Sequence, residues 1–204
     1  MYQAILFDIG GVLVDFDPKE YLMERFMRTH VEEILYDITF GSPEWAALDA
    51  GTMTRYQAER IMLEKAEKVG YSYEVKEILY DWLRILRPRQ KVLELVRKLK
   101  KNGYKLYYLS NIAPDTLEYV KKLGVLDDFD GGLASFEIQH NKPDPVIYRT
   151  LLKRYDLDPK TCIFIDDSDV NVRAAYNLGI TSVALHRSVN ALLRNLRSCG
   201  INLK

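Results

Sequence analysis

From Arg89 onward, short apolar runs typical of buried strands alternate with amphipathic stretches typical of helices. The apolar runs lie at residues 104–109, 132–136, 162–165 and 181–185, and helical stretches lie at 92–101, 115–123 and 145–155. Two further helices are expected, one that ends at residue 178 and one that begins at residue 191. Another short apolar run, 4–7, opens the chain. Strands that alternate with helices form a parallel sheet covered on both faces. The sequence therefore predicts an α/β fold with a Rossmann-like, doubly wound parallel sheet.

Residues 18–87 interrupt this alternation, because their apolar residues recur at three- and four-residue spacing with no convincing strand pattern. The stretch Thr52-Met53-Thr54-Arg55 offers a helix start and Gly70 a helix stop, and Arg87-Pro88 closes a helix expected from 73 to 86. Since this block follows the first strand, we expect an all-helical cap inserted into a core of residues 1–17 and 88–204. Chain order places the cap beside the carboxyl edge of the sheet.

Charge and composition exclude several classes of protein. The 204 residues contain 29 lysines and arginines against 29 aspartates and glutamates, so no positive excess indicates a nucleic-acid or anionic-membrane partner. Two cysteines are too few for a disulfide framework or a thiolate metal site. No apolar run approaches the roughly 18 residues of a membrane span, and the start shows no signal-type segment. We expect a soluble cytoplasmic protein of undetermined oligomeric state.

Polar residues follow the apolar runs at four points of the predicted core. They are Asp8, Ser110-Asn111, Lys142 and the pair Asp166-Asp167. Ligands of open α/β sheets bind outside the carboxyl ends of the strands, so these side chains are expected to converge on one crevice. Carboxylates together with a lysine and a hydroxyl suit a hard cation and an anion at the same site.

These four points resemble the motifs of the haloacid dehalogenase superfamily, most of whose members are magnesium-dependent phosphohydrolases. The resemblance covers residues 1–17 and 88–204 in the family order. Its most specific parts are Lys-Pro-Asp-Pro-Val-Ile-Tyr from Lys142, and Ile-Asp-Asp-Ser from Ile165 followed by Asn171. The chain is identified as a member of this superfamily, which implies a small-molecule phosphate ester as substrate.

The resemblance assigns the phosphate chemistry by motif position. Asp8 is expected to act as the nucleophile that forms an aspartyl phosphate, which divides one difficult step into two. Ser110 and the backbone of Asn111 are expected to bind phosphoryl oxygens, and Lys142 to offset the negative charge. Gly11 lets the backbone approach the phosphate closely.

The resemblance also implies a Mg²⁺ cofactor. The expected ligands are Asp8, the main-chain carbonyl of Gly10 and Asp167, since Asp167 and Asn171 have the spacing of the fourth motif. Asp166 and Asn171 are expected to orient these ligands.

Gly10 occupies the position where most phosphatases of the superfamily carry an aspartate that protonates the leaving group. General acid–base catalysis contributes roughly 10²–10⁴-fold. Three interpretations are open: a substrate with a good leaving group, a substitute acid such as Asp15 or Asp17, or a protein that only binds phosphorylated ligands. The first motif and the inserted helices resemble α-D-glucose-1-phosphate phosphatases and the N-terminal phosphatase domain of epoxide hydrolases, which favours a sugar phosphate. A metal-independent dehalogenase is a further alternative.

The cap offers three candidate substrate contacts, Trp45, Asp49 and Arg55. The alternative is that Asp49 bounds a helix and Trp45 packs in the cap core. His140, two residues before Lys142, is a candidate for the entrance of the site, whereas His30 and His186 are expected at the surface.

Overall fold

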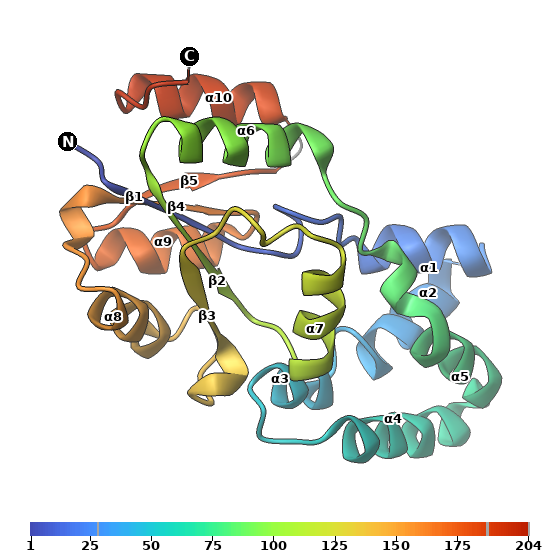
Figure 1. The fold of residues 1–204 in the computed structure, drawn as a ribbon. Helices are drawn as coiled ribbons and strands as arrows, with labels where there is room; N and C mark the ends of the chain where they lie inside the picture. The colour runs from blue at the N-terminus through green and yellow to red at the C-terminus, as the bar shows by residue number, and fades with distance from the viewer. Residues whose placement is uncertain (28, 187, 204) are drawn as a thin grey trace.

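The structure, a computed structural model, describes residues 1–27, 29–186 and 188–203. Its centre is one parallel sheet with the strand order β3-β2-β1-β4-β5 (Figure 1). The strands are β1 (Ala4–Phe7), β2 (Lys105–Ser110), β3 (Gly131–Ala134), β4 (Cys162–Asp166) and β5 (Thr181–Ala184). The chain runs outward from β1 to β3 and returns to the other side of β1 with β4. The predicted doubly wound α/β fold is confirmed.

Helices cover both faces of this sheet. The helices of this part of the chain are α6 (Gln90–Lys101), α7 (Pro114–Lys122), α8 (Pro145–Arg154), α9 (Asp169–Asn177) and α10 (Val189–Ser198), with the short 3-10 helices η2 (Ser135–Glu137) and η3 (Pro159–Thr161). Ile5 and Phe7 of β1 belong to the hydrophobic core that includes α6 and α10, whereas Ala4 and Leu6 belong to the core under α8. Because successive strand residues face opposite sides, both faces of β1 are buried.

The segment between β1 and α6 is helical in the structure. It contains α1 (Pro18–Phe26), α2 (Thr29–Ile38), α3 (Pro43–Asp49), α4 (Arg55–Val69), α5 (Ser72–Asp81) and the 3-10 helix η1 (Trp82–Ile85). The expected single helix over 73–86 is thus an α-helix that ends at Asp81 and a tighter turn that begins with Trp82. Trp82 is buried and packs against Trp45 with ring centroids 4.8 Å apart, which fixes this turn against α3.

Two neighbouring stretches join the helical segment to the sheet. The Asp15 amide donates to the Arg87 carbonyl at 2.8 Å, and the Arg89 amide donates to the Leu13 carbonyl at 2.9 Å. The outgoing and returning chain therefore run side by side at the carboxyl end of β1, where α1 and α5 also lie close together (Figure 1).

Helix α3 is bonded to the segment that follows the carboxyl end of β3. The Asn141 amide donates to the Ala46 carbonyl at 2.8 Å, and the Ser135 hydroxyl donates to the Asp49 carbonyl. These contacts place α3 over the edge of the sheet where the strands end. None of the helices among the described residues has the length and hydropathy that a bilayer crossing requires.

Candidate active site

Three aspartates meet at the carboxyl end of the sheet. Asp8 directly follows β1, Asp166 is the last residue of β4 and Asp167 comes next. One carboxylate oxygen from each lies within 4.8 Å of the other two. Because β1 and β4 are neighbours at the point where the strand order reverses, the topology brings these acids to the crevice where open α/β sheets bind ligands.

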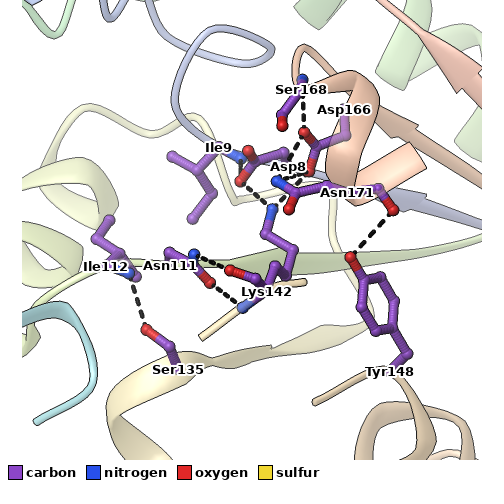
Figure 2. Close-up of polar contacts among 10 residues, drawn as sticks. All are labelled: Asp8, Ile9, Asn111, Ile112, Ser135, Lys142, Tyr148, Asp166, Ser168 and Asn171. Atoms are coloured by element: carbon purple, nitrogen blue, oxygen red, sulfur yellow. Dashed lines mark hydrogen bonds and ion pairs between the residues drawn. The ribbon is translucent and has the colours of Figure 1, made fainter. Parts of the chain in front are cut away.

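Lys142 reaches this cluster from the loop between η2 and α8 (Figure 2). Its Nζ lies 2.9 Å from Asp8 Oδ1 and 2.7 Å from Asp166 Oδ2, and the residue is only 4% exposed. Burial disfavours the charged form of Lys142, but the negative charges of Asp8 and Asp166 outweigh that effect and raise its pKa. The lysine is therefore a fixed positive charge beside the predicted nucleophile.

The cluster still carries an excess of negative charge. Burial raises the pKa of Asp8 to about 7, against the opposing charge of Lys142 and with support from Asp166 and Asp167. Desolvation and the charge of Asp166 also raise the pKa of Asp167. One lysine faces three carboxyl groups, so a bound cation would relieve the repulsion among them.

Both carboxylate oxygens of Asp166 accept hydrogen bonds from other residues of the protein. Oδ1 accepts hydrogen bonds from the Ser168 amide at 2.8 Å and from Asn171 Nδ2 at 3.1 Å, while Oδ2 accepts from Lys142 (Figure 2). The Tyr148 hydroxyl in turn donates to the Asn171 carbonyl at 3.1 Å. Asp166 and Asn171 thus hold Lys142 and the start of α9 in place.

Asp8 and Asp167 keep oxygens available for a ligand. Asp8 Oδ1 accepts from the Ile9 amide at 2.7 Å and from Lys142, but Oδ2 has no hydrogen-bond or ion-pair partner among the described residues. The Asp167 side chain is exposed and forms no ion pair within the same part of the chain. Of the neighbouring acids Asp166 and Asp167, only Asp167 thus keeps its carboxylate free of ion pairs among the described residues, and its choice as a metal ligand stays a prediction.

The loop after β1 passes close to Asp167 at Gly11. Gly11 has a φ of +69°, and a Cβ placed there would lie 2.1 Å from Asp167 Oδ2. Only glycine permits this approach without strain. The Arg89 guanidinium donates to the Gly11 carbonyl, which fastens the loop to the start of α6.

Ser110 and Asn111 have different roles in the structure. Ser110 ends β2, is 2% exposed, and its hydroxyl forms no hydrogen bond within the described residues. Asn111 Nδ2 donates to the Lys142 carbonyl at 2.9 Å, and Asn111 Oδ1 accepts from the Lys142 amide at 2.6 Å (Figure 2). The sequence predicted a backbone role for Asn111, and the structure adds that its side chain holds the Lys142 loop.

These groups line one cavity of about 380 Å³. The sheet and its loops contribute a polar wall, and the helical segment contributes the opposite wall. Its lining includes Asp8, Gly10, Ser110, Asn111, Lys142, Asp167 and Asn171 on the sheet side, and Phe40, Ser42, Trp45 and Asp49 on the helical side, with Phe16 and Asn141 between them.

The candidate cap contacts separate into two groups. Trp45 and Asp49 line the cavity, whereas Arg55 pairs with Asp115 at 2.7 Å and does not. His140 pairs with Asp144 at 2.9 Å and is outside the lining, which instead includes its neighbour Asn141. His30 and His186 are exposed, as expected.

Sequence reasoning missed Asn141, Phe40 and the side-chain role of Asn111. No short-range signal marked them, because their contacts join segments far apart in the chain.

The family assignment is confirmed by the comparison with known families. A family model described as haloacid dehalogenase-like hydrolase matches residues 2–179, and the chain belongs to this family. The protein is therefore a hydrolase whose reacting groups are expected at this edge of the sheet.

Individual relatives resemble the chain along most of its length. A sesquiterpene phosphatase of Aspergillus oryzae is 28% identical over 97% of this chain and 98% of its own. A phosphorylated carbohydrates phosphatase of Thermotoga maritima is 25% identical over 89% of this chain and 83% of its own. A haloacid dehalogenase family enzyme of Bacteroides thetaiotaomicron, solved as a variant with magnesium and inorganic phosphate, is 25% identical with a TM-score of 0.72, covering 95% of this chain and 99% of that one.

Proposed function

We propose that this protein is a Mg²⁺-dependent phosphatase that acts on a small phosphorylated metabolite through an aspartyl phosphate on Asp8. The observation that carries the proposal is Asp8 Oδ2, which has no partner among the described residues, beside Lys142 and in the same cavity as the Ser110 hydroxyl, which those residues likewise leave without a hydrogen bond. The nucleophile, a buried cation and a phosphoryl-binding donor therefore face one space. The named activities of the two relatives support the same reaction class.

The residues present fit a magnesium ion. Asp8 and Asp167 offer unpaired carboxylate oxygens in a cluster with excess negative charge, and oxygen donors are the ligands that Mg²⁺ prefers. Asp8, Asp167 and the Gly10 carbonyl would hold the ion. When bound, the ion neutralises charge on the phosphoryl group and on the carboxylates around it.

The chain's own residues would perform the phosphoryl transfer. Asp8 attacks phosphorus, and its orientation is fixed by the Ile9 amide and by Lys142. Lys142 and Ser110 stabilise the negative charge on the phosphoryl oxygens. Asp166, Asn171 and Asn111 act indirectly, because they hold Lys142 in place.

We further propose that residues 18–87 act as a cap over a core formed by residues 1–17 and 88–204. The helical side of the cavity supplies an aromatic wall, with Phe40 and Trp45 ring centroids 4.7 Å apart, and a polar group at Asp49. An aromatic face with a carboxyl group beside it suits a hydroxylated substrate, so a sugar phosphate is favoured over a purely apolar ester.

One experiment tests this function. The purified protein is expected to hydrolyse 4-nitrophenyl phosphate and sugar phosphates with Mg²⁺, to lose activity in EDTA, and to be inactive as Asp8→Asn. The exposed Asp37→Asn variant serves as the matched control and should retain wild-type rates. Acid quenching should trap phosphate on Asp8 in the wild type.

Hydrolysis that persists in Asp8→Asn would exclude the proposed nucleophile, and binding without turnover would favour a phospho-ligand sensor. Metal-independent cleavage of a haloacid would indicate a dehalogenase instead.

A further inference from the structure

The cavity around Asp8 contains a carboxyl group that the phosphoryl transfer described above does not use. Among the described residues that line it, Asp8, Asp49 and Asp167 carry carboxyl groups. Asp8 and Asp167 belong to the metal cluster, whereas Asp49 comes from the opposite, helical wall. Gly10, which has no side chain to transfer a proton, lines the same space.

Contacts with the core fix the position of Asp49. It ends α3, and its carbonyl accepts a hydrogen bond from the Ser135 hydroxyl. Ser135 also accepts from the Ile112 amide at 3.0 Å, which ties it to the loop after β2 (Figure 2). At Gly51, a Cβ would lie only 2.9 Å from Phe136 Cβ, so the chain after α3 is packed against η2. The sheet side of the site therefore positions Asp49 directly.

The surroundings of Asp49 favour a carboxyl group that can both give and take a proton. Burial raises the pKa of Asp49 to about 7, and the charges of Asp115 and Asp8 add to this. Arg55 and the Ala113 backbone amide oppose the shift without cancelling it, and the Arg55 guanidinium is committed to Asp115 through hydrogen bonds of 2.7 and 2.9 Å. A general acid works best when its pKa lies near the operating pH.

The two acids closest to Asp8 in sequence point elsewhere. Asp15 and Asp17 line a neighbouring crevice beside α1, which shares Phe16 and Asp167 with the cavity that holds Asp8. Asp15 lies 3.6 Å from Arg89, and Asp17 accepts a hydrogen bond from the Glu20 amide at 3.0 Å as the cap of α1. Neither residue belongs to the lining of the cavity that holds Asp8, whereas Asp49 does.

We propose that Asp49 is the general acid and base of this enzyme and replaces the carboxylate absent at Gly10; this inference rests on the phosphatase function proposed above. As Asp8 forms a bond to phosphorus, the bond from phosphorus to the leaving oxygen breaks and Asp49 donates its proton to that oxygen. The resulting Asp49 carboxylate then accepts a proton from water. That water attacks phosphorus, the bond to Asp8 breaks, and phosphate leaves.

The test compares two leaving groups in the Mg²⁺-loaded protein. Asp49→Asn keeps the shape of the side chain but cannot transfer a proton. For phenyl phosphate, a poor leaving group, kcat/KM should fall roughly 10²–10³-fold, and for 4-nitrophenyl phosphate less than tenfold. The variant should also release a burst of one 4-nitrophenol per active site, because loss of the base slows hydrolysis of the phosphorylated Asp8. Asp37→Asn, on the exposed face of α2, should show none of these effects.

The pH profile provides a second measurement. Because the acid must be protonated, wild-type kcat/KM for phenyl phosphate should decline above about pH 7, and Asp49→Asn should lose this decline. An equal loss on both leaving groups, or no loss on either, overturns the role of Asp49 while leaving the phosphatase function intact. Failure of the phosphatase function itself would instead appear as an inactive wild type or an active Asp8→Asn variant.

Discussion

The side chain of Asn111 and the backbone of Lys142 form a closed pair of hydrogen bonds, 2.9 Å from Nδ2 to the carbonyl and 2.6 Å from the amide to Oδ1. The pair joins the carboxyl end of β2 to the loop that carries Lys142. The lysine ammonium, in turn, lies within 2.9 Å of Asp8 and 2.7 Å of Asp166. The position of the positive charge at the nucleophile thus depends on an amide that touches neither carboxylate.

Asn111→Ala should lower both the activity and the stability of the protein. The variant leaves the Lys142 amide and carbonyl without these partners, and each group left unsatisfied costs about 1–3 kcal/mol. Misplacement of Lys142 by about 1 Å is enough to lower kcat/KM roughly 100-fold. Urea unfolding and steady-state kinetics measure the two effects. Exposed Asn177→Ala is the control, and unchanged kinetics in Asn111→Ala would show that the hydrogen-bonded pair has no part in positioning Lys142.

Gly11 and Gly10 should respond differently to the same substitution. Gly11→Ala places a Cβ 2.1 Å from Asp167 Oδ2 at a φ of +69°, so the loop or Asp167 must move. At Gly10 the nearest atom to a Cβ is Phe16 Cβ at 3.5 Å, an ordinary contact. We expect the Mg²⁺ concentration for half-maximal activity to rise 10- to 100-fold in Gly11→Ala and to change by less than about threefold in Gly10→Ala. Similar Mg²⁺ titrations for the two variants would contradict this account.

Substitution of Asp167 should mainly affect Mg²⁺ binding, whereas substitution of Asp166 should mainly affect the stability of the protein. Asp167→Asn removes a carboxylate with no ion pair among the described residues, so Mg²⁺ should no longer raise the Tm, while the Tm without metal should stay the same or rise. Asp166→Asn takes a charge from Lys142, which is buried, and should destabilise the protein by about 3–5 kcal/mol. Differential scanning fluorimetry with and without Mg²⁺ distinguishes the two. If Mg²⁺ raised the Tm of Asp167→Asn as much as that of the wild type, the ion would be held by other residues.

The raised pKa of Asp49 should make the stability of the folded protein depend on pH. Its pKa is raised in the folded protein to about 7 from an ordinary value near 4, so the folded state binds its proton more tightly than the unfolded state. The stability contributed by protonated Asp49 is therefore complete below about pH 4 and is lost as the pH rises through about 7. Asp49→Asn should gain stability relative to the wild type across this interval. Because both proteins share the other titrating groups, Asp8, Asp115 and Asp167 among them, a pH-independent difference would contradict the raised pKa of Asp49.

The strand-end residues of the site could be predicted from sequence because parallel strands bring their ends to one edge. Each of Asp8, Ser110 and Asp166 follows an apolar run that could only be a buried strand, so their proximity follows from the fold class. The family resemblance supplied their roles. Lys142 was expected beside them as a loop-end residue, and its role likewise came from the resemblance.

The helical wall of the site could not be predicted in the same way. Hydrophobic periodicity indicates that residues 43–49 form a helix, but not which loops of the sheet that helix will touch. Asp49 is positioned by Ser135, and Asn141 bonds to Ala46, so both contacts cross between distant segments. Asp15 and Asp17 were attractive substitutes for the missing acid because they are near Asp8 in sequence. The chain turns away at Val14, which bonds to the Ile9 carbonyl and lies beside Pro88, and it carries both acids to another crevice.

The pairing of β1 with β4 sets Ala4 beside Cys162 and brings Asp8 to Asp167. Residues 5–161, most of the chain, lie in the loop that this pairing closes, and such long-range contacts form slowly because the loop's entropy must be lost first. We therefore expect the catalytic cluster to form late in refolding. The backbone hydrogen bonds within α6 are local and close no long loop, so this helix can form earlier. After dilution from denaturant, enzymatic activity should therefore return with the formation of the β1–β4 pairing. It should return later than the circular dichroism signal of the helices.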